Sequence, residues 1–185
     1  MSSIEKDKLK IPGRKLAAIA FPVEHNVTEK GKVVYGSLPD RRLIEGWTDI
    51  LDAQKLFGKH VKDAIGFHNL IEQGFPYSSV EHIKKMLDLS DRELAVMLDI
   101  SERTLARVKK SRDRLSAGVS DRLYRIARIF SMACYVFEDK TAAKKWLRSA
   151  QIGLGGNVPL DLMHTEAGSQ EVEDLLGRIE YGVIS

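Results

Sequence analysis

The chain has 185 residues, of which 43% are hydrophobic and 30% are charged, and its formal net charge is +3. This length suffices for one domain with additions or for two small domains. Because the net charge is so small, any affinity for nucleic acid must come from local clusters of basic residues. We recognise neither a signal peptide nor a transmembrane run, and the single cysteine, Cys134, excludes an internal disulfide. We therefore predict a cytoplasmic protein that spans no membrane.

Residues 1–40 are the least regular part of the sequence. The first fifteen residues are polar and basic, and Gly31, Gly36 and Pro39 interrupt the stretch that follows. A short strand at Lys32–Tyr35 has no obvious pairing partner. We predict a flexible N-terminal segment over residues 1–40.

Apolar residues take helical spacing from Leu43 onward. Two amphipathic helices are expected, the first ending near Gly58 and the second at Gly74, with Pro76 beyond it. Their apolar positions are Trp47, Ile50, Leu51, Leu56, Val61, Ile65, Leu70 and Ile71. We treat residues 41–76 as one helical segment.

The next two helices are predicted from capping boxes. Ser78 with Glu81, and again Ser90 with Glu93, have the spacing at which a hydroxyl and a carboxylate satisfy free backbone amides at a helix start. The buried stripe of the helix that follows Ser78 is expected to be Val80, Ile83, Met86 and Leu87.

The segment from residue 91 to residue 110 predicts a helix-turn-helix, two short helices joined by a tight corner. Ala95 is small where the two helices must approach closely, and Ser101 is placed to cap the second helix. Asp99 takes a corner position that commonly carries glycine because the backbone there is left-handed, a conformation that aspartate tolerates. The residues expected to face the shared core are Ile100, Leu105 and Val108.

The outer face of the second helix carries the predicted DNA contacts, and its members are Glu102, Arg103, Ala106, Arg107 and Lys110. Such a helix fits the major groove, where we expect Arg103 and Arg107 to bind guanine edges in bidentate fashion. Glu102 either accepts from a cytosine amino group or complements the helix dipole. The residues expected to meet phosphates are Ser101, Thr104, Lys109 and Lys110.

Local charge supports this interpretation. Residues 101–128 hold nine basic and three acidic side chains, a net charge of +6. The alternative is an ordinary solvated helix face. We favour DNA binding because the corner spacing and the charge coincide, and we place the DNA-binding core at residues 77–137.

Three further helices complete an all-α prediction. The longest is expected over residues 121–137, and the next is expected to be capped by Thr141. A glycine-rich loop spans residues 153–159. The last helix is expected to begin at Thr165 or Ser169 and to end at Gly182, with its apolar stripe formed by Val172, Leu175, Leu176 and Ile179.

The chain ends in an acidic region. Residues 151–185 contain six acids and one arginine, a net charge of −5. Such a segment adds nothing to DNA affinity and suits a basic or apolar protein partner, or folding back on the helical bundle. From the residues alone, ordinary core packing is the favoured interpretation of the apolar stripe.

A family resemblance bears on this choice. The runs GGNVPLDL at residues 155–162, TEAG at 165–168 and EVEDLLGRIEYG at 171–182 resemble the toxin-binding C-terminal domain of MbcA/ParS/Xre antitoxins. The upstream run LDLSDRELAVMLDISERTL is similar to the Xre-type helix-turn-helix of the same family. The resemblance covers residues 80–183 and implies a helix-turn-helix bundle followed by a small helical toxin-binding domain.

The resemblance also implies a function. Members are antitoxins of type II toxin–antitoxin pairs whose usual partner is a RES-domain toxin that depletes NAD. Their C-terminal region is implied to cover the NAD-binding cleft, and the antitoxin, often with its toxin, is implied to bind operator DNA. We expect a homodimer within a larger toxin–antitoxin complex, since one module reads few bases, and residues 41–76 are the candidate dimer surface.

Carried onto this chain, the toxin-binding domain spans residues 138–185, with Leu160–Ser185 facing the toxin. The expected contacts are Glu173, Arg178, Glu180, Tyr181, Gly182 and Val183. Glu166 and Glu171 are weaker candidates, and Thr165 is expected to cap the helix. A cleft that binds a pyrophosphate should be electropositive, so an acidic helix end would complement it.

Catalysis is not predicted. The glycines at residues 153–157 follow a helix rather than a strand, the five histidines lack metal-ligand spacing, and Cys134 lies within an apolar helix. We expect neither enzyme activity nor a cofactor. The rival interpretations are a stand-alone transcriptional regulator whose C-terminal helices only dimerise, a protein scaffold that has lost DNA binding, and an enzyme.

Overall fold

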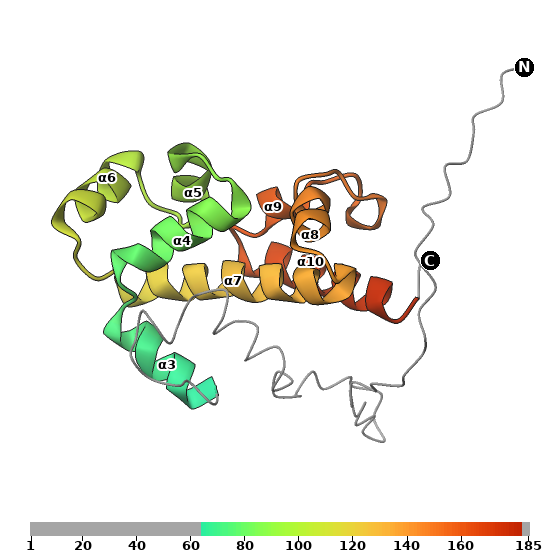
Figure 1. Ribbon diagram of the computed structural model, residues 1–185, viewed down its shortest axis with the longest axis horizontal. Helices are drawn as coiled ribbons and strands as arrows, with labels where there is room; N and C mark the ends of the chain where they lie inside the picture. The colour runs from blue at the N-terminus through green and yellow to red at the C-terminus, as the bar shows by residue number, and fades with distance from the viewer. Residues whose placement is uncertain (1–63, 183–185) are drawn as a thin grey trace, which may run out of the picture. The chain divides into compact units, whose positions relative to one another are not determined.

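The computed structural model describes residues 64–182, and across them the chain forms α-helices and one 3-10 turn with no β-strand (Figure 1). The elements are α3 (Ala64–Gln73), α4 (Tyr77–Leu87), α5 (Asp91–Met97), α6 (Glu102–Ser111), α7 (Ala117–Phe137), α8 (Lys140–Leu147), η1 (Ile152–Leu154), α9 (Pro159–Leu162) and α10 (Glu166–Glu180). The all-α prediction is confirmed. None of these helices is long and apolar enough to cross a membrane.

Several sequence predictions lie outside the described residues. These are the flexible segment at residues 1–40, the strand at Lys32–Tyr35, the first amphipathic helix and the contact assigned to Val183.

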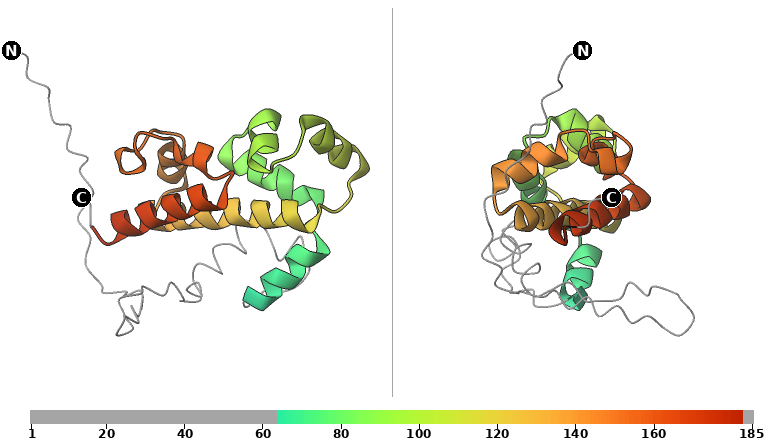
Figure 2. Two further views of the ribbon diagram at one scale, coloured as in Figure 1. Left: turned by 180° about the vertical axis from the view of Figure 1, so that it is seen from behind. Right: turned by 90° about the vertical axis from the view of Figure 1, so that its right-hand side faces the viewer.

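The 21-residue helix α7 is the element against which four other helices pack. It contacts α3, α4, α8 and α10, and α10 runs alongside it in the views of Figures 1 and 2. A helix covered on several sides must be apolar on several sides. Accordingly, the apolar α7 side chains with 1% exposure or less are Leu123, Ile126, Ala127, Ile129, Phe130 and Ala133.

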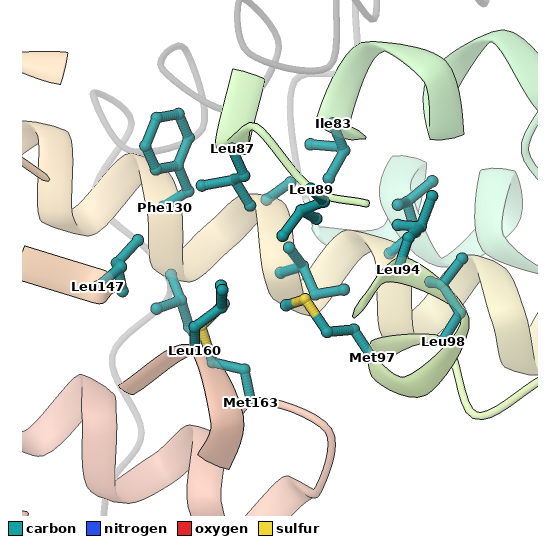
Figure 3. Packing of buried hydrophobic residues seen from close by; sticks show 14 of the residues in the cluster. Ile83, Leu87, Leu89, Leu94, Met97, Leu98, Phe130, Leu147, Leu160 and Met163 are labelled. Carbon is teal, nitrogen blue, oxygen red and sulfur yellow. The ribbon is translucent and has the colours of Figure 1, made fainter. Parts of the chain in front are cut away.

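One hydrophobic core joins the helix-turn-helix to the C-terminal helices. In Figure 3, Leu87 of α4 and Leu94 of α5 share a cluster with Phe130 of α7, Leu147 of α8 and Leu160 of α9. Each fully buried leucine or phenylalanine contributes roughly 1.5–3 kcal/mol through removal of apolar surface from water. The two halves therefore stabilise each other.

Three predicted helix starts are wrong. Helix α4 begins at Tyr77 behind Pro76, with no side-chain cap, because residues 75 and 76 pair with the segment before α7: Leu115 donates its amide to the Phe75 carbonyl at 2.8 Å. Ser78 therefore lies inside the first turn of α4, where its hydroxyl does not cap the helix.

Helix α7 begins at Ala117, capped by Ser116, rather than at residue 121. Ser120 is buried inside the helix, where its hydroxyl accepts a hydrogen bond from the Phe75 amide at 2.8 Å. Helix α8 is capped by Asp139, whose Oδ1 accepts from the Ala142 amide at 2.6 Å, so Thr141 lies within the helix.

The buried side of α3 also differs from the prediction. Ile65 is 71% exposed, whereas Phe67 and Leu70 are buried. These two residues are three positions apart and define the face toward α7, and Ile65 projects away from that face. In α4, Val80, Ile83 and Leu87 are buried as expected, and Met86 is partly buried.

Candidate functional site

The helix-turn-helix is built as its local sequence predicts. The capping box of α5 is complete, since the Ser90 hydroxyl accepts from the Glu93 amide at 3.1 Å and the Glu93 carboxylate accepts from the Ser90 amide at 2.7 Å. At the corner Asp99 is left-handed, with φ of 51°. Ser101 caps α6 by accepting from the Thr104 amide at 3.0 Å. The prediction of two short helices around a left-handed aspartate is confirmed.

The inner side of α6 packs and its outer side is exposed. Leu105 is buried, and Ile100 and Val108 are partly buried against the core. The predicted contact residues that are exposed are Ser101, Glu102, Arg103, Arg107, Lys109 and Lys110. Thr104 is half-buried and hydrogen-bonds the Ser101 hydroxyl at 2.9 Å. The chain therefore presents one polar, cation-rich helix face.

Most of the basic cluster counted in the sequence is engaged elsewhere. Five of the nine cations make contacts within the chain: Arg112 with Glu81, Arg114 with the Gly74 carbonyl, Arg122 with Asp99, Arg125 with Asp121 and Glu166, and Arg128 with Glu173. The side chains of Arg103, Arg107 and Lys110 form no ion pair with another described residue. The charge available to a nucleic acid is therefore concentrated on α6 itself.

The last helix lies on α7 through its apolar stripe. Thr165 caps it by accepting from the Gly168 amide at 3.0 Å, which confirms the earlier of the two predicted starts. Val172 and Leu176 are fully buried and Leu175 is 8% exposed. The stripe is core packing, as its spacing predicted.

Glu173 faces α7 rather than solvent. Its side chain is 17% exposed and pairs with Arg128. Burial raises the pKa of the Glu173 carboxyl, and the neighbouring Arg128 charge opposes that rise without cancelling it. In the free chain this residue is therefore an interhelical contact, and its role in binding a toxin stays a prediction.

The other predicted toxin contacts gather at the C-terminal end of α10. Arg178 donates to the Gly153 carbonyl in η1 at 3.4 Å, and Tyr181 is 54% exposed. Glu180 is half-buried, and Gly182 is exposed with φ of 69°. One exposed end therefore joins the tip of the last helix to the glycine-rich turn.

Two glycines permit close approaches that sequence reasoning missed. A Cβ on Gly168 would lie 2.2 Å from the Leu162 carbonyl oxygen, and one on Gly153 would lie 2.6 Å from Leu175 Cδ1. Glycine within the TEAG run allows α10 to start directly against α9. The glycine is visible in the sequence, but the need for glycine at this position comes from a tertiary contact.

An open polar pocket of about 540 Å³ lies between the two halves. It is lined by Asp99, Gly118, Asp121, Arg122, Arg125, His164, Thr165 and Glu166. The corner before α6, the first turns of α7 and the start of α10 meet there.

Comparison with known proteins identifies both halves. Residues 66–128 match the family model of the antitoxin Xre-like helix-turn-helix domain, and residues 132–182 match that of the antitoxin Xre/MbcA/ParS C-terminal toxin-binding domain. An antitoxin Xre from Yersinia enterocolitica is 33% identical over 116 residues, which cover 62% of this chain and 78% of the relative. The chain belongs to the Xre antitoxin family.

Two other relatives of this antitoxin agree. An antitoxin Xre from Photorhabdus laumondii is 28% identical over 117 residues, covering 63% of this chain and 79% of the relative. One from Pseudomonas putida is 37% identical over 68 residues, covering 37% of this chain and 43% of the relative. The two family matches meet within α7, so the antitoxin carries its helix-turn-helix and its toxin-binding helices on one shared helix.

The antitoxin family indicates a regulatory protein. Cys134 has the chemistry of a partly buried structural thiol. The thiol is partly buried on α7, and burial raises its pKa to about 11. A thiol held so far from ionisation at neutral pH is a poor nucleophile.

Proposed function

We propose that this antitoxin neutralises a RES-domain toxin that depletes NAD, by covering the toxin's active site, and that it represses its own operon through α6. The charge distribution supports this division. Cations that form no ion pair with another described residue lie on α6, whereas the toxin-binding domain ends in an acidic helix with an exposed tip.

For DNA, α6 enters the major groove. Arg103 and Arg107 contact guanine edges, and Glu102 contacts a cytosine or complements the dipole. Ser101, Thr104, Lys109 and Lys110 meet phosphates, which orient the helix. The proposal is supported by the exposure of this face and by the ion pairs that engage the neighbouring Arg122 and Arg125 within the chain.

For the toxin, the tip of α10 enters the NAD-binding cleft. Arg178, Glu180, Tyr181, Gly182 and Val183 make the direct contacts, and Glu173 joins them if the toxin displaces it from Arg128. An NAD cleft must hold a pyrophosphate, so donors in that cleft would bind the carboxylates at the helix end through charge-assisted hydrogen bonds.

The observation that carries the proposal is the position of the exposed tip within the matched toxin-binding domain. The apolar side of α10 is already buried on α7, so the exposed end and outer face of the helix are what remain for a partner. The test is co-expression with the RES-domain toxin encoded in the same operon, measuring growth, cellular NAD and co-purification. Failure to form a complex, with NAD still depleted, would refute the proposal.

The packing of α10 disfavours the stand-alone regulator whose last helices only dimerise. A dimer built on α10 would need an exposed apolar stripe, whereas Val172, Leu175 and Leu176 are buried within one chain. We place dimerisation at residues 41–76, where Ile65 of α3 is 71% exposed. We further propose that residues 77–137 form the DNA-binding core and that residues 138–185 form the toxin-binding domain.

A further inference from the structure

A single apolar side chain projects from the turn between α8 and α9. Ile152, the first residue of η1, is 97% exposed, more than any other large hydrophobic side chain that the structure describes. An isolated exposed isoleucine is common on protein surfaces. What distinguishes Ile152 is the rigidity of the turn that holds it.

Hydrogen bonds close this turn from both sides. The amides of Gln151 and Gly156 donate to the carbonyls of Asn157 and Gln151 at 3.0 and 2.9 Å. The Asn157 side chain donates to the Leu154 carbonyl at 2.7 Å, and the Gln151 side chain donates to the Trp146 carbonyl at 3.0 Å. The backbone around Ile152 is therefore ordered before any partner arrives.

Apolar contacts fix the turn to the rest of the domain. Leu154 is 8% exposed, and Gly153 is so close to Leu175 of α10 that a Cβ would lie 2.6 Å from its Cδ1. Leu154 thus faces inward and Gly153 lies against α10, whereas the Ile152 side chain is almost fully exposed. The fold supports the turn without using its most apolar residue.

The turn is continuous with the tip of α10. Arg178 donates to the Gly153 carbonyl, next to Ile152, and Tyr181 lies three positions after Arg178 on the same side of the helix. In Figure 1 the orange turn and the red end of α10 lie at the same end of the described chain. Arginine and tyrosine are enriched among the residues that dominate binding energy at interfaces.

We propose that Ile152 is an apolar anchor that inserts into a pocket beside the toxin's active-site cleft, while the α10 tip enters the cleft itself. This inference rests on the proposed function and adds a second point of contact to it. Because the turn is already ordered, little conformational entropy is lost when the isoleucine is buried. The occupant is the toxin rather than a second copy, since Ile152 lies within the matched toxin-binding domain and beside Arg178.

The test uses the full-length antitoxin and the purified RES-domain toxin of its operon, with affinity measured by calorimetry or biolayer interferometry. Ile152→Ala should weaken binding about 10- to 100-fold, and Ile152→Asp should weaken it further. Val96→Ala is the matched control, because Val96 is an aliphatic residue that is 60% exposed on α5, outside the toxin-binding domain. It should leave toxin affinity unchanged.

Three outcomes would overturn the inference. If Ile152→Asp bound the toxin as tightly as wild type, the anchor role of Ile152 would be refuted and the proposed function would stand. Absence of wild-type binding would overturn both. A changed sedimentation coefficient of Ile152→Ala in the absence of toxin would make this a self-association surface. Unchanged thermal unfolding and operator affinity of the variants would show that the fold is unaffected.

Discussion

Arg125 of α7 pairs with Glu166 in the first turn of α10, with 2.7 Å between Nε and Oε2. One turn earlier on α7, Arg122 pairs with Asp99 at the corner before α6, at 2.8 Å. Neighbouring arginines on one helix thus connect the corner before α6 with the first turn of α10, and both pairs line the pocket between the two halves.

Glu166→Gln should lower the free energy of unfolding by less than about 1 kcal/mol, because the Glu166 side chain is 69% exposed and water screens the pair. Urea denaturation measures this loss, which should shrink at high salt. Glu171→Gln, an exposed position on the same helix, is the control. An effect at Glu166 no larger than at Glu171 would show that the pair contributes nothing.

Arg103→Ala and Arg107→Ala should each weaken operator binding by roughly 1–3 kcal/mol and relax base preference at one position. Fluorescence anisotropy with operator and scrambled duplexes measures both effects. Lys145→Ala removes an exposed cation from α8 and should leave operator affinity unchanged. Equal operator binding by wild type and the double arginine variant would refute the groove assignment.

Deletion from Gly177 onward should abolish toxin neutralisation and leave DNA binding largely intact, because the helix-turn-helix does not include this end. Deletion from Tyr181 onward is the milder variant, since it spares Ile179, which packs against the core. Growth rescue and operator affinity are measured in parallel. Full rescue by the longer deletion would place the inhibitory surface elsewhere.

Two glycines of α10 should respond oppositely to alanine. Gly168→Ala should destabilise the fold by about 2 kcal/mol or more, since its Cβ would lie 2.2 Å from a backbone carbonyl oxygen. A Cβ at Gly177 would have no neighbouring atom within 4 Å, so Gly177→Ala should stabilise the fold by about 0.5–1 kcal/mol through helix propensity. Thermal unfolding of the pair checks both signs. Similar midpoints for the two variants would contradict the close approach at Gly168.

Cys134 should react slowly with thiol reagents in the folded protein. Burial raises its pKa from 9.0 to about 11, so at pH 8 its thiolate fraction is about 100-fold below that of an unshifted thiol. The reaction rate with Ellman's reagent should keep rising with pH beyond 9. A rate that levels off near pH 9 would contradict the raised pKa, and guanidinium-unfolded protein is the fast-reacting control.

The same pKa shift affects stability. The folded state favours the neutral thiol of Cys134. The contribution of this thiol to the free energy of unfolding is therefore fully present below pH 9 and is lost as pH rises toward 11.

The sequence by itself determined the features that depend on residues within about one helical turn. The Ser90–Glu93 capping box, the left-handed Asp99, the Ser101 cap and the α10 stripe were all predictable, because each rests on neighbours a few positions away. The all-α class followed from the same periodicity.

Only the tertiary structure decided which of the basic residues remain available for DNA. Arg125 and Arg128 resemble Arg103 and Arg107 in sequence, yet they are paired with acids of α10, far along the chain. The tertiary structure alone also decided that Gly168 lies close against α9 and that Ile152 projects into solvent. Ion-pair choice, close approach and exposure depend on which distant segments fold together, and no local pattern encodes that.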